Sequence, residues 1–417
     1  MNIEPGTDLA GMDPAKLEDM RTAMQAYIDD EKLASIVTMV WRDGTLVTAD
    51  AFGVQDLETK IPTQIDSIFR IYSMTKPITG VALMTLWEQG KFQLDDPVAD
   101  YLPQLRDVDV FIERKDDGTI VTEPCNSPIT IRHLMTHSAG FSYGWMPDSV
   151  VDALYVDAGV NDYGGTVMGN VDKLGRIPLN YQPGTEFRYS VAVDVQAALI
   201  EVLSGLAYRD YLKRAVLDPL GMVDTDFFVP EAKRDRFVSN YSPGEGAVVP
   251  ALAFRGDPFG KAGIERIDQP GHGSVYDSLP SFTMGGGGLA STALDYLKFA
   301  TMLASRGVLD GTRILQPETV DLMTQNHLPE DLTPIKLLVM EMPETGFGLD
   351  LSIRMTDEID YWPGSVGEYG WSGMASTHFF VAPKHNLVGI LLTQMTPAYT
   401  YLIELEFKKH IYAALSS

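Results

Sequence analysis

Residues 68–90 read IFRIYSMTKPITGVALMTLWEQG, a short apolar run that leads directly into a run with helical spacing. Val81, Met84 and Trp87 recur every three residues, which predicts one face of a helix over residues 75–88. The single proline of this run falls in the first helical turn, where proline is tolerated. The stretch therefore predicts a strand followed at once by a helix.

Ser73 and Lys76 form a Ser-x-x-Lys motif at the start of this helix. Positions three residues apart share a helix face, so the lysine amine can reach the serine hydroxyl. A lysine that is partly desolvated or close to other cations can lose its proton and act as a base. The free N–H groups at a helix start favour negative charge on the hydroxyl oxygen. Because the motif is short, its position between a strand and a helix is what supports a nucleophile and its base.

Two further motifs are candidates for the same chemistry. Tyr189 follows a loop and precedes an expected helix, so it is either a second base or a buried aromatic residue with a bonded hydroxyl. Trp371, Ser372 and Gly373 precede an expected strand over residues 377–381. A strand beside a nucleophile can offer a backbone N–H to an oxyanion hole, whereas the alternative for this segment is a tight turn with a core tryptophan.

A competing serine, Ser142, lies in a Gly-x-Ser-x-Gly run over residues 140–144. This pattern is the nucleophile elbow of α/β-hydrolases, which requires a strand before the serine and a helix after it. Residues 129–137 instead predict a helix that ends at the first glycine of the run. The context favours Ser73 as the nucleophile.

Metal and cofactor sites are not expected. His133 and His137 have a spacing that can bind zinc on a helix, but the residues between them lack the glutamate of a metalloprotease helix. Cys125 is the only cysteine, which excludes an intrachain disulfide and zinc sites built from several cysteines. The glycine run at residues 285–288 lacks the Lys-Ser/Thr of a phosphate loop.

Composition narrows the class of protein. The chain has 417 residues, of which 45% are hydrophobic, so a large core is possible. With 32 basic and 57 acidic residues the formal charge is −25, which argues against nucleic acid and anionic membranes as partners. No apolar run of 18 residues occurs, and residues 1–18 do not resemble a signal peptide. We therefore expect a soluble cytoplasmic protein.

Strand patterns lie at both ends of the chain. Asp43 and Gly44 predict a tight hairpin turn between two strands, because such turns need positive φ angles. Strands that pair across the chain would form one antiparallel sheet flanked by helices, an α/β (α+β) fold. We predict an α/β domain from residues 1–90 and 282–417, and a mostly helical inserted domain over residues 91–281. The expected strands are residues 36–41, 45–52, 347–354, 377–381 and 387–394.

The order of the three motifs, Ser-x-x-Lys, then Tyr-Ser, then Trp-Ser-Gly, resembles the serine hydrolases of the β-lactamase and penicillin-binding-protein superfamily. Within it, the chain is most similar to the class C β-lactamase-like esterases called family VIII carboxylesterases. The resemblance spans nearly the whole chain. It also covers residues 94–98, 131–140, 285–289 and 367–371.

The resemblance implies a role for each motif. Ser73 would be the acylated nucleophile, Lys76 would activate it, and Tyr189 would share the work of base and acid. The backbone N–H groups of Ser73 and Met374 would form the oxyanion hole. The Trp-Ser-Gly segment would contact the substrate.

Two departures from the class C β-lactamases bear on the substrate. Val191 stands where those enzymes have an asparagine, and Trp371-Ser372-Gly373 stands where they have Lys-Thr-Gly. A cation that could hold a β-lactam carboxylate and an amide that could hold its side chain are therefore missing. Both losses favour neutral esters.

The resemblance implies a serine carboxylesterase that acts on short-chain esters through a covalent acyl-enzyme, without a cofactor. Three alternatives stay open: a β-lactamase or D-Ala peptidase-like hydrolase, an acyltransferase like the related statin-side-chain enzymes, and a catalytically inactive binding protein. The expected partner is a small-molecule ester, and the sequence leaves the oligomeric state open.

Overall fold

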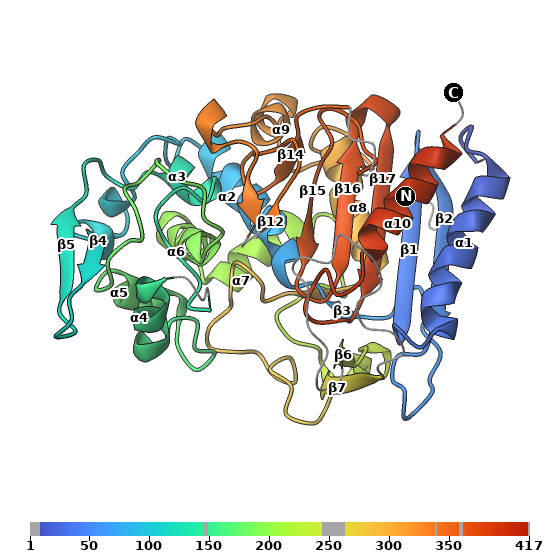
Figure 1. Ribbon diagram of the computed structural model, residues 1–417. Helices are drawn as coiled ribbons and strands as arrows, with labels where there is room; N and C mark the ends of the chain where they lie inside the picture. Colours follow the sequence, from blue (N-terminus) through green and yellow to red (C-terminus); the bar gives the residue numbers. More distant parts are fainter. Residues whose placement is uncertain (1–8, 146–148, 244–262, 338–339, 358–361, 416–417) are drawn as a thin grey trace.

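A seven-stranded antiparallel sheet forms the centre of the fold, and both ends of the chain contribute to it (Figure 1). The computed structural model describes residues 9–145, 149–243, 263–337, 340–357 and 362–415. The N-terminal hairpin pairs with the last strand of the chain, so β1 and β17 lie side by side. In spatial order the strands are β13 (Thr345–Phe347), β14 (Ser352–Arg354), β15 (Tyr369–Gly373), β16 (Thr377–Ala382), β17 (Leu387–Thr393), β1 (Ser35–Arg42) and β2 (Thr45–Gly53).

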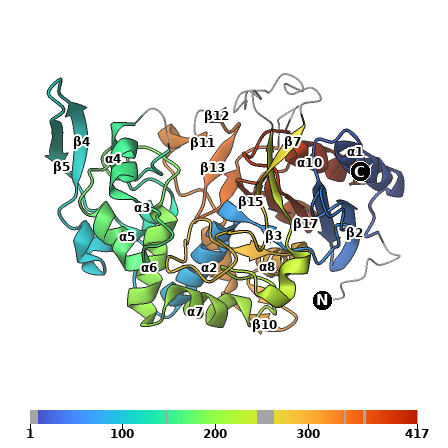
Figure 2. The same cartoon turned by 90° about the horizontal axis from the view of Figure 1, so that it is seen from below.

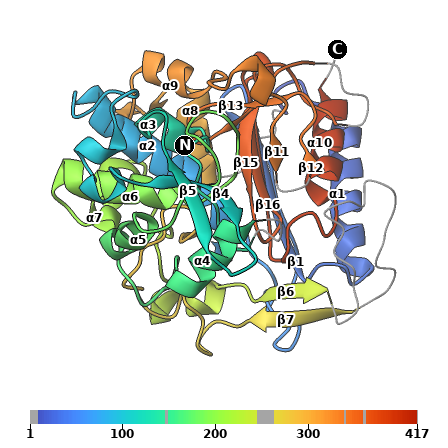
Figure 3. The same ribbon diagram turned by 60° about the vertical axis from the view of Figure 1, so that its left-hand side comes forward.

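Helices cover both faces of this sheet (Figure 3). On one face α1 (Pro14–Asp29) and α10 (Ile403–Ala414) pack on apolar side chains that include Val40 and Phe380. On the other face α8 (Ala293–Ala304) packs on the alternate residues of the same strands, among them Met39 and Phe379. Successive strand residues point to opposite faces, which is why one apolar strand can serve both layers.

A mostly helical region lies beside the sheet, with α2 (Thr75–Glu88) between the two (Figure 2). The hairpin of β4 and β5 projects from this region. Its elements are α3 (Ile131–Met135), α4 (Val150–Ala158), α5 (Val167–Leu174), α6 (Ala192–Ser204), α7 (Tyr208–Leu212), β4 (Asp109–Arg114) and β5 (Ile120–Pro124). The remaining elements are β3 (Phe69–Arg70), β6 (Asn240–Pro243), β7 (Ile264–Asp268), β8 (Ala290–Ser291), β9 (Val308–Leu309), β10 (Thr312–Arg313), α9 (Pro317–Met323), β11 (Lys336–Leu337) and β12 (Met340–Glu341).

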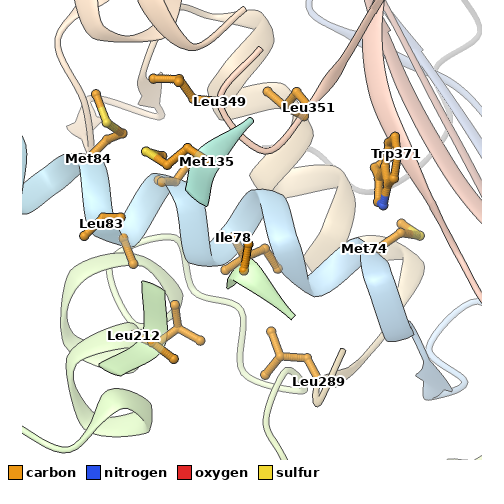
Figure 4. Packing of buried hydrophobic residues seen from close by; sticks show 14 of the residues in the cluster. Met74, Ile78, Leu83, Met84, Met135, Leu212, Leu289, Leu349, Leu351 and Trp371 are labelled. Carbon is orange, nitrogen blue, oxygen red and sulfur yellow. The ribbon is translucent and has the colours of Figure 1, made fainter. Parts of the chain in front are cut away.

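The helix α2 is buried on nearly all sides, as a helix that is apolar all round must be. Its side chains point toward different neighbours: Leu83 lies on the side of Leu212, and Met84 on the side of Met135 (Figure 4). Burial against so many elements fixes the position of the first turn of α2, where the Ser-x-x-Lys motif lies.

The predicted α/β fold with an antiparallel sheet and flanking helices is confirmed. The predicted hairpin turn is also present, with φ of 48° at Asp43 and 87° at Gly44. The domain boundaries at residues 90 and 282 stay a prediction.

Two local predictions were wrong. The single strand expected over residues 347–354 is a hairpin of β13 and β14, because the chain reverses after Gly348 through a positive φ of 61° at Asp350. The Trp-Ser-Gly segment, considered alone, favoured a tight turn with a core tryptophan. It is instead the end of strand β15, although Trp371 is buried as that interpretation expected. There Trp371 pairs with Phe379 across the sheet.

Candidate active site

Lys76 faces the hydroxyl of Ser73 at the N-terminal end of α2. Ser73 lies in a short 3₁₀ turn, Tyr72–Met74, and its side chain is only partly buried, whereas Lys76 is completely buried. The Lys76 Nζ lies 3.2 Å from Ser73 Oγ and donates a second hydrogen bond to the carbonyl oxygen of Gly286 at 2.5 Å. The lysine is thus held against an accessible serine, which is the arrangement that an activated nucleophile needs.

Two tyrosine rings enclose the Lys76 amine. Its Nζ lies 4.5 Å from the ring centre of Tyr189 and 5.4 Å from that of Tyr143. The Tyr189 hydroxyl oxygen accepts a hydrogen bond from Trp371 Nε1 at 3.2 Å. The structure therefore brings the residues of all three motifs together around Lys76. Tyr143 was missed, because it belongs to the Gly-x-Ser-x-Gly run that the sequence argued against.

A buried carboxyl group, Asp194, was also missed. Its Oδ1 accepts the backbone N–H of Gly286 at 2.9 Å, so the same peptide segment is held by Asp194 on its N–H and by Lys76 on its carbonyl. Burial raises the pKa of Asp194 to about 6, although the nearby Lys76 opposes that rise. No spacing in the sequence signals this contact, since Asp194 and Gly286 are 92 residues apart.

The end of β15 lies against the turn that carries the serine. At Gly373 a Cβ atom would approach the carbonyl oxygen of Ile71 to 2.4 Å, so only glycine fits there. Thr377 Oγ1 donates to the same carbonyl at 3.4 Å. Ser73 and Met374 both line the pocket described next. This approach is compatible with an oxyanion hole formed by their N–H groups, which stays a prediction.

A pocket of about 360 Å³ opens at Ser73 and continues along β15. Its lining combines many apolar side chains with several charged ones. The lining includes Ser73, Trp145, Tyr189, Leu337, Met340, Met342, Trp371, Ser372, Gly373, Met374 and Tyr399, and, among the polar residues, Arg354, Glu368, His378, Glu404 and Lys408. A pocket of this kind suits a small molecule with an apolar body.

Ser142 is placed differently from Ser73. It is completely buried, its Oγ donates to Asp152 at 2.6 Å, and the same oxygen accepts from Arg188 Nε at 3.2 Å. It is not among the described residues that line the pocket. These two hydrogen bonds hold Ser142 in the loop after α3. The element that precedes Ser142 is thus a helix, whereas a nucleophile elbow requires a strand.

The two histidines do not share a helix face, because α3 ends at Met135 and His137 has a φ of 53°. His133 Nδ1 accepts the backbone N–H of Thr130, and His137 Nδ1 contacts Ser190 Oγ at 3.3 Å. Within the described ranges, no group of three or more His, Cys, Asp or Glu side chains is placed to hold a metal ion.

Comparison with known proteins identifies the family. A profile of the β-lactamase family matches residues 20–406. The chain belongs to the β-lactamase family. This β-lactamase family member is 30% identical to esterase EstB of Burkholderia gladioli, over 92% of this chain and 94% of that protein. It is 28% identical to lovastatin esterase of Penicillium rubens, over 89% and 91% of the two chains.

Among solved structures it is similar to EstCE1, described as a hydrolase with promiscuous acyltransferase activity. The TM-score is 0.77 at 25% identity, and the match covers 95% of this chain and 98% of the other. These matches confirm the resemblance to family VIII-like serine esterases that the three motifs indicated. In the part of the chain that the structure describes, no helix is long and apolar enough to cross a bilayer.

Proposed function

We propose that this β-lactamase family member is a serine carboxylesterase that hydrolyses short-chain esters through an acyl-enzyme on Ser73. The observation that carries the proposal is the Lys76 amine, 3.2 Å from the hydroxyl of a partly exposed Ser73 inside a largely apolar pocket. The names of the relatives EstB and lovastatin esterase agree with it.

The residues divide the reaction between them. Ser73 Oγ attacks the ester carbonyl while Lys76 takes its proton, and Tyr189 shares the transfer of that proton to the leaving alkoxide. The N–H groups of Ser73 and Met374 stabilise the negative oxygen of the tetrahedral intermediate. Water then attacks the acyl-enzyme and releases the acid.

The surroundings of Trp371 favour neutral esters over β-lactams. Its indole is a neutral hydrogen-bond donor already engaged with Tyr189, so it offers no charged partner to a carboxylate beside the reacting bond. Val191 is completely buried and supplies no amide. The cations that line the pocket, Arg354 and Lys408, both bond Glu368, which directly precedes β15 and is five residues from Gly373. A β-lactam would therefore lose a charge-assisted contact, which costs roughly ten- to a hundredfold in rate.

The test compares two substrates on one preparation. We expect kcat/KM for a short p-nitrophenyl ester well above that for a chromogenic cephalosporin, with Ser73→Ala as the blank. A cephalosporin rate equal to or above the ester rate would instead favour the β-lactamase alternative.

Acyl transfer is the second candidate, favoured by the extended pocket and by the description of EstCE1. In that reaction an alcohol replaces water in the second step. Adding a primary alcohol at fixed ester concentration would divert the acyl group into a new ester. The ratio of new ester to free acid measures the partition between the two reactions.

A further inference from the structure

Beyond the nucleophile, the pocket follows the face of β15 that is turned toward α10. Ser372 pairs with His378, and Gly370 pairs with Phe380, so these four residues share that face, and all line the pocket. Glu404 and Lys408, both on α10, line it on the side of the helix. Because Ser372 and Gly370 have little or no side chain, a trough remains between the sheet and the helix.

Three polar atoms along this trough are buried without a hydrogen-bond partner among the described residues. They are His378 Nε2, Glu404 Oε1 and Arg354 Nη2. Glu404 is 4% exposed and Arg354 is 6% exposed, and both side chains line the pocket. Buried polar groups are normally hydrogen-bonded, so three unpartnered atoms in one pocket indicate a polar ligand.

The other charges of the trough are already paired. Glu368 accepts hydrogen bonds from Lys408 on one oxygen and from Tyr412 on the other, which occupies both oxygens of that carboxylate. Arg354 donates its Nε–H to the carbonyl oxygen of Thr356 at 2.9 Å, and the described residues contain no carboxylate within ion-pair distance of it. The carboxylates of Glu368, Asp357 and Glu344 act on Arg354 electrostatically, but none of them forms an ion pair with it, and its Nη2 keeps a free donor.

The other two unpartnered groups, Glu404 and His378, would not repel a bound anion at mildly acidic pH. Burial raises the pKa of Glu404 to about 7, so below that pH its carboxyl is mostly protonated and can donate a hydrogen bond. Burial lowers the pKa of His378 to about 3, so its ring is neutral there. Its Nδ1 contacts Ser372 Oγ at 2.8 Å, which leaves Nε2 facing the pocket.

We propose that the Arg354 end of the pocket binds a carboxylate that the substrate carries far from its reacting ester. The preferred substrates would then be esters of long ω-carboxy acids or alcohols, an inference that rests on the proposed esterase function. The distance between Arg354 and the nucleophile determines the chain length of the preferred substrate. Its backbone N–H bonds the carbonyl of Glu368, five residues before Gly373 in the chain, which corresponds to roughly 16 Å of strand.

The experiment uses p-nitrophenyl monoesters of linear dicarboxylic acids of increasing length, measured at pH 6. Each is compared with the same ester whose far carboxyl is methylated, and with one that ends in a hydroxyl. We expect the ratio of kcat/KM for the carboxylate over its methyl ester to pass through a maximum at long chains. Arg354→Gln should lower that maximum by roughly 10- to 100-fold, and because it is a ratio of two esters on one variant, a general loss of rate cancels.

Arg306→Gln is the matched control, since Arg306 is an exposed arginine paired with Asp321, and its loss changes the net charge equally. A ratio below one at every length, or a maximum that Arg354→Gln leaves unchanged, would overturn the proposal. A preference for the hydroxyl ester would overturn the assignment to an anion.

If Arg354→Gln does not fold, the chain-length series on the wild type decides. If the wild type hydrolyses no ester faster than Ser73→Ala does, the proposed esterase function is wrong. That outcome differs from a failure of the carboxylate site, in which the esters react but show no preference.

Discussion

Trp371 Nε1 donates a hydrogen bond to the hydroxyl oxygen of Tyr189 at 3.2 Å, and the two ring centres lie 5.4 Å apart. This contact joins the end of strand β15 to the candidate base beside Lys76. Trp371 is therefore placed to position Tyr189, in addition to its predicted contact with the substrate.

Trp371→Phe removes this donor and keeps an aromatic ring in place. A neutral hydrogen bond contributes about 0.5–1.5 kcal/mol net, so we expect kcat to fall about two- to tenfold. The measurement is steady-state hydrolysis of a p-nitrophenyl ester, with thermal unfolding to show that the variant is folded. An unchanged kcat would mean that the indole N–H does not assist Tyr189.

Lys76 and Tyr189 are expected to act as a unit. Lys76→Ala and Tyr189→Phe should each lower kcat by about 10² to 10⁴, the range for general acid–base catalysis. The double variant should lose little more than the worse single variant, because groups that share one proton transfer are strongly non-additive. A loss equal to the product of both would argue for independent roles.

The sequence predicted those parts of the site whose structure is determined by a local pattern of residues. The helix predicted over residues 75–88 has those bounds, because an apolar run with a proline in its first turn specifies helix locally. The order of the three motifs placed Ser73, Lys76 and Tyr189 in one site, and the structure brings them together.

Contacts made between distant segments were not predictable. Asp194 reaches Gly286 only after α6 packs against α2, and Arg354 joins Lys408 in one pocket only after the sheet forms. One missed element did carry a signal. In Tyr369–Gly373 the large side chains alternate with glycine and serine, the period of a strand, but the glycines suggested a turn.

Glu404 gives a prediction for stability against pH. Burial raises its pKa from 4.5 to about 7, although Lys408 opposes the rise. The stability that this carboxyl contributes is therefore fully present below pH 4.5 and is lost as the pH rises through about 7. Glu404→Gln does not titrate, so its free energy of unfolding relative to wild type should increase between pH 5 and pH 8, by at most about 3 kcal/mol.

Urea unfolding at both pH values measures this difference. Glu113→Gln, at an exposed position of strand β4, is the control and should show no such change. The same stability difference between Glu404→Gln and wild type at pH 5 and at pH 8 would show that the carboxyl is not desolvated.

The most direct test of the account is the identity of the acylated residue. A serine-directed phosphonate should add once per chain, and peptide mapping by mass spectrometry should place it on Ser73. Ser142→Ala should still be labelled and should keep substantial activity, whereas Ser73→Ala should show neither label nor hydrolysis. A phosphonate found on Ser142, or an active Ser73→Ala variant, would contradict the account.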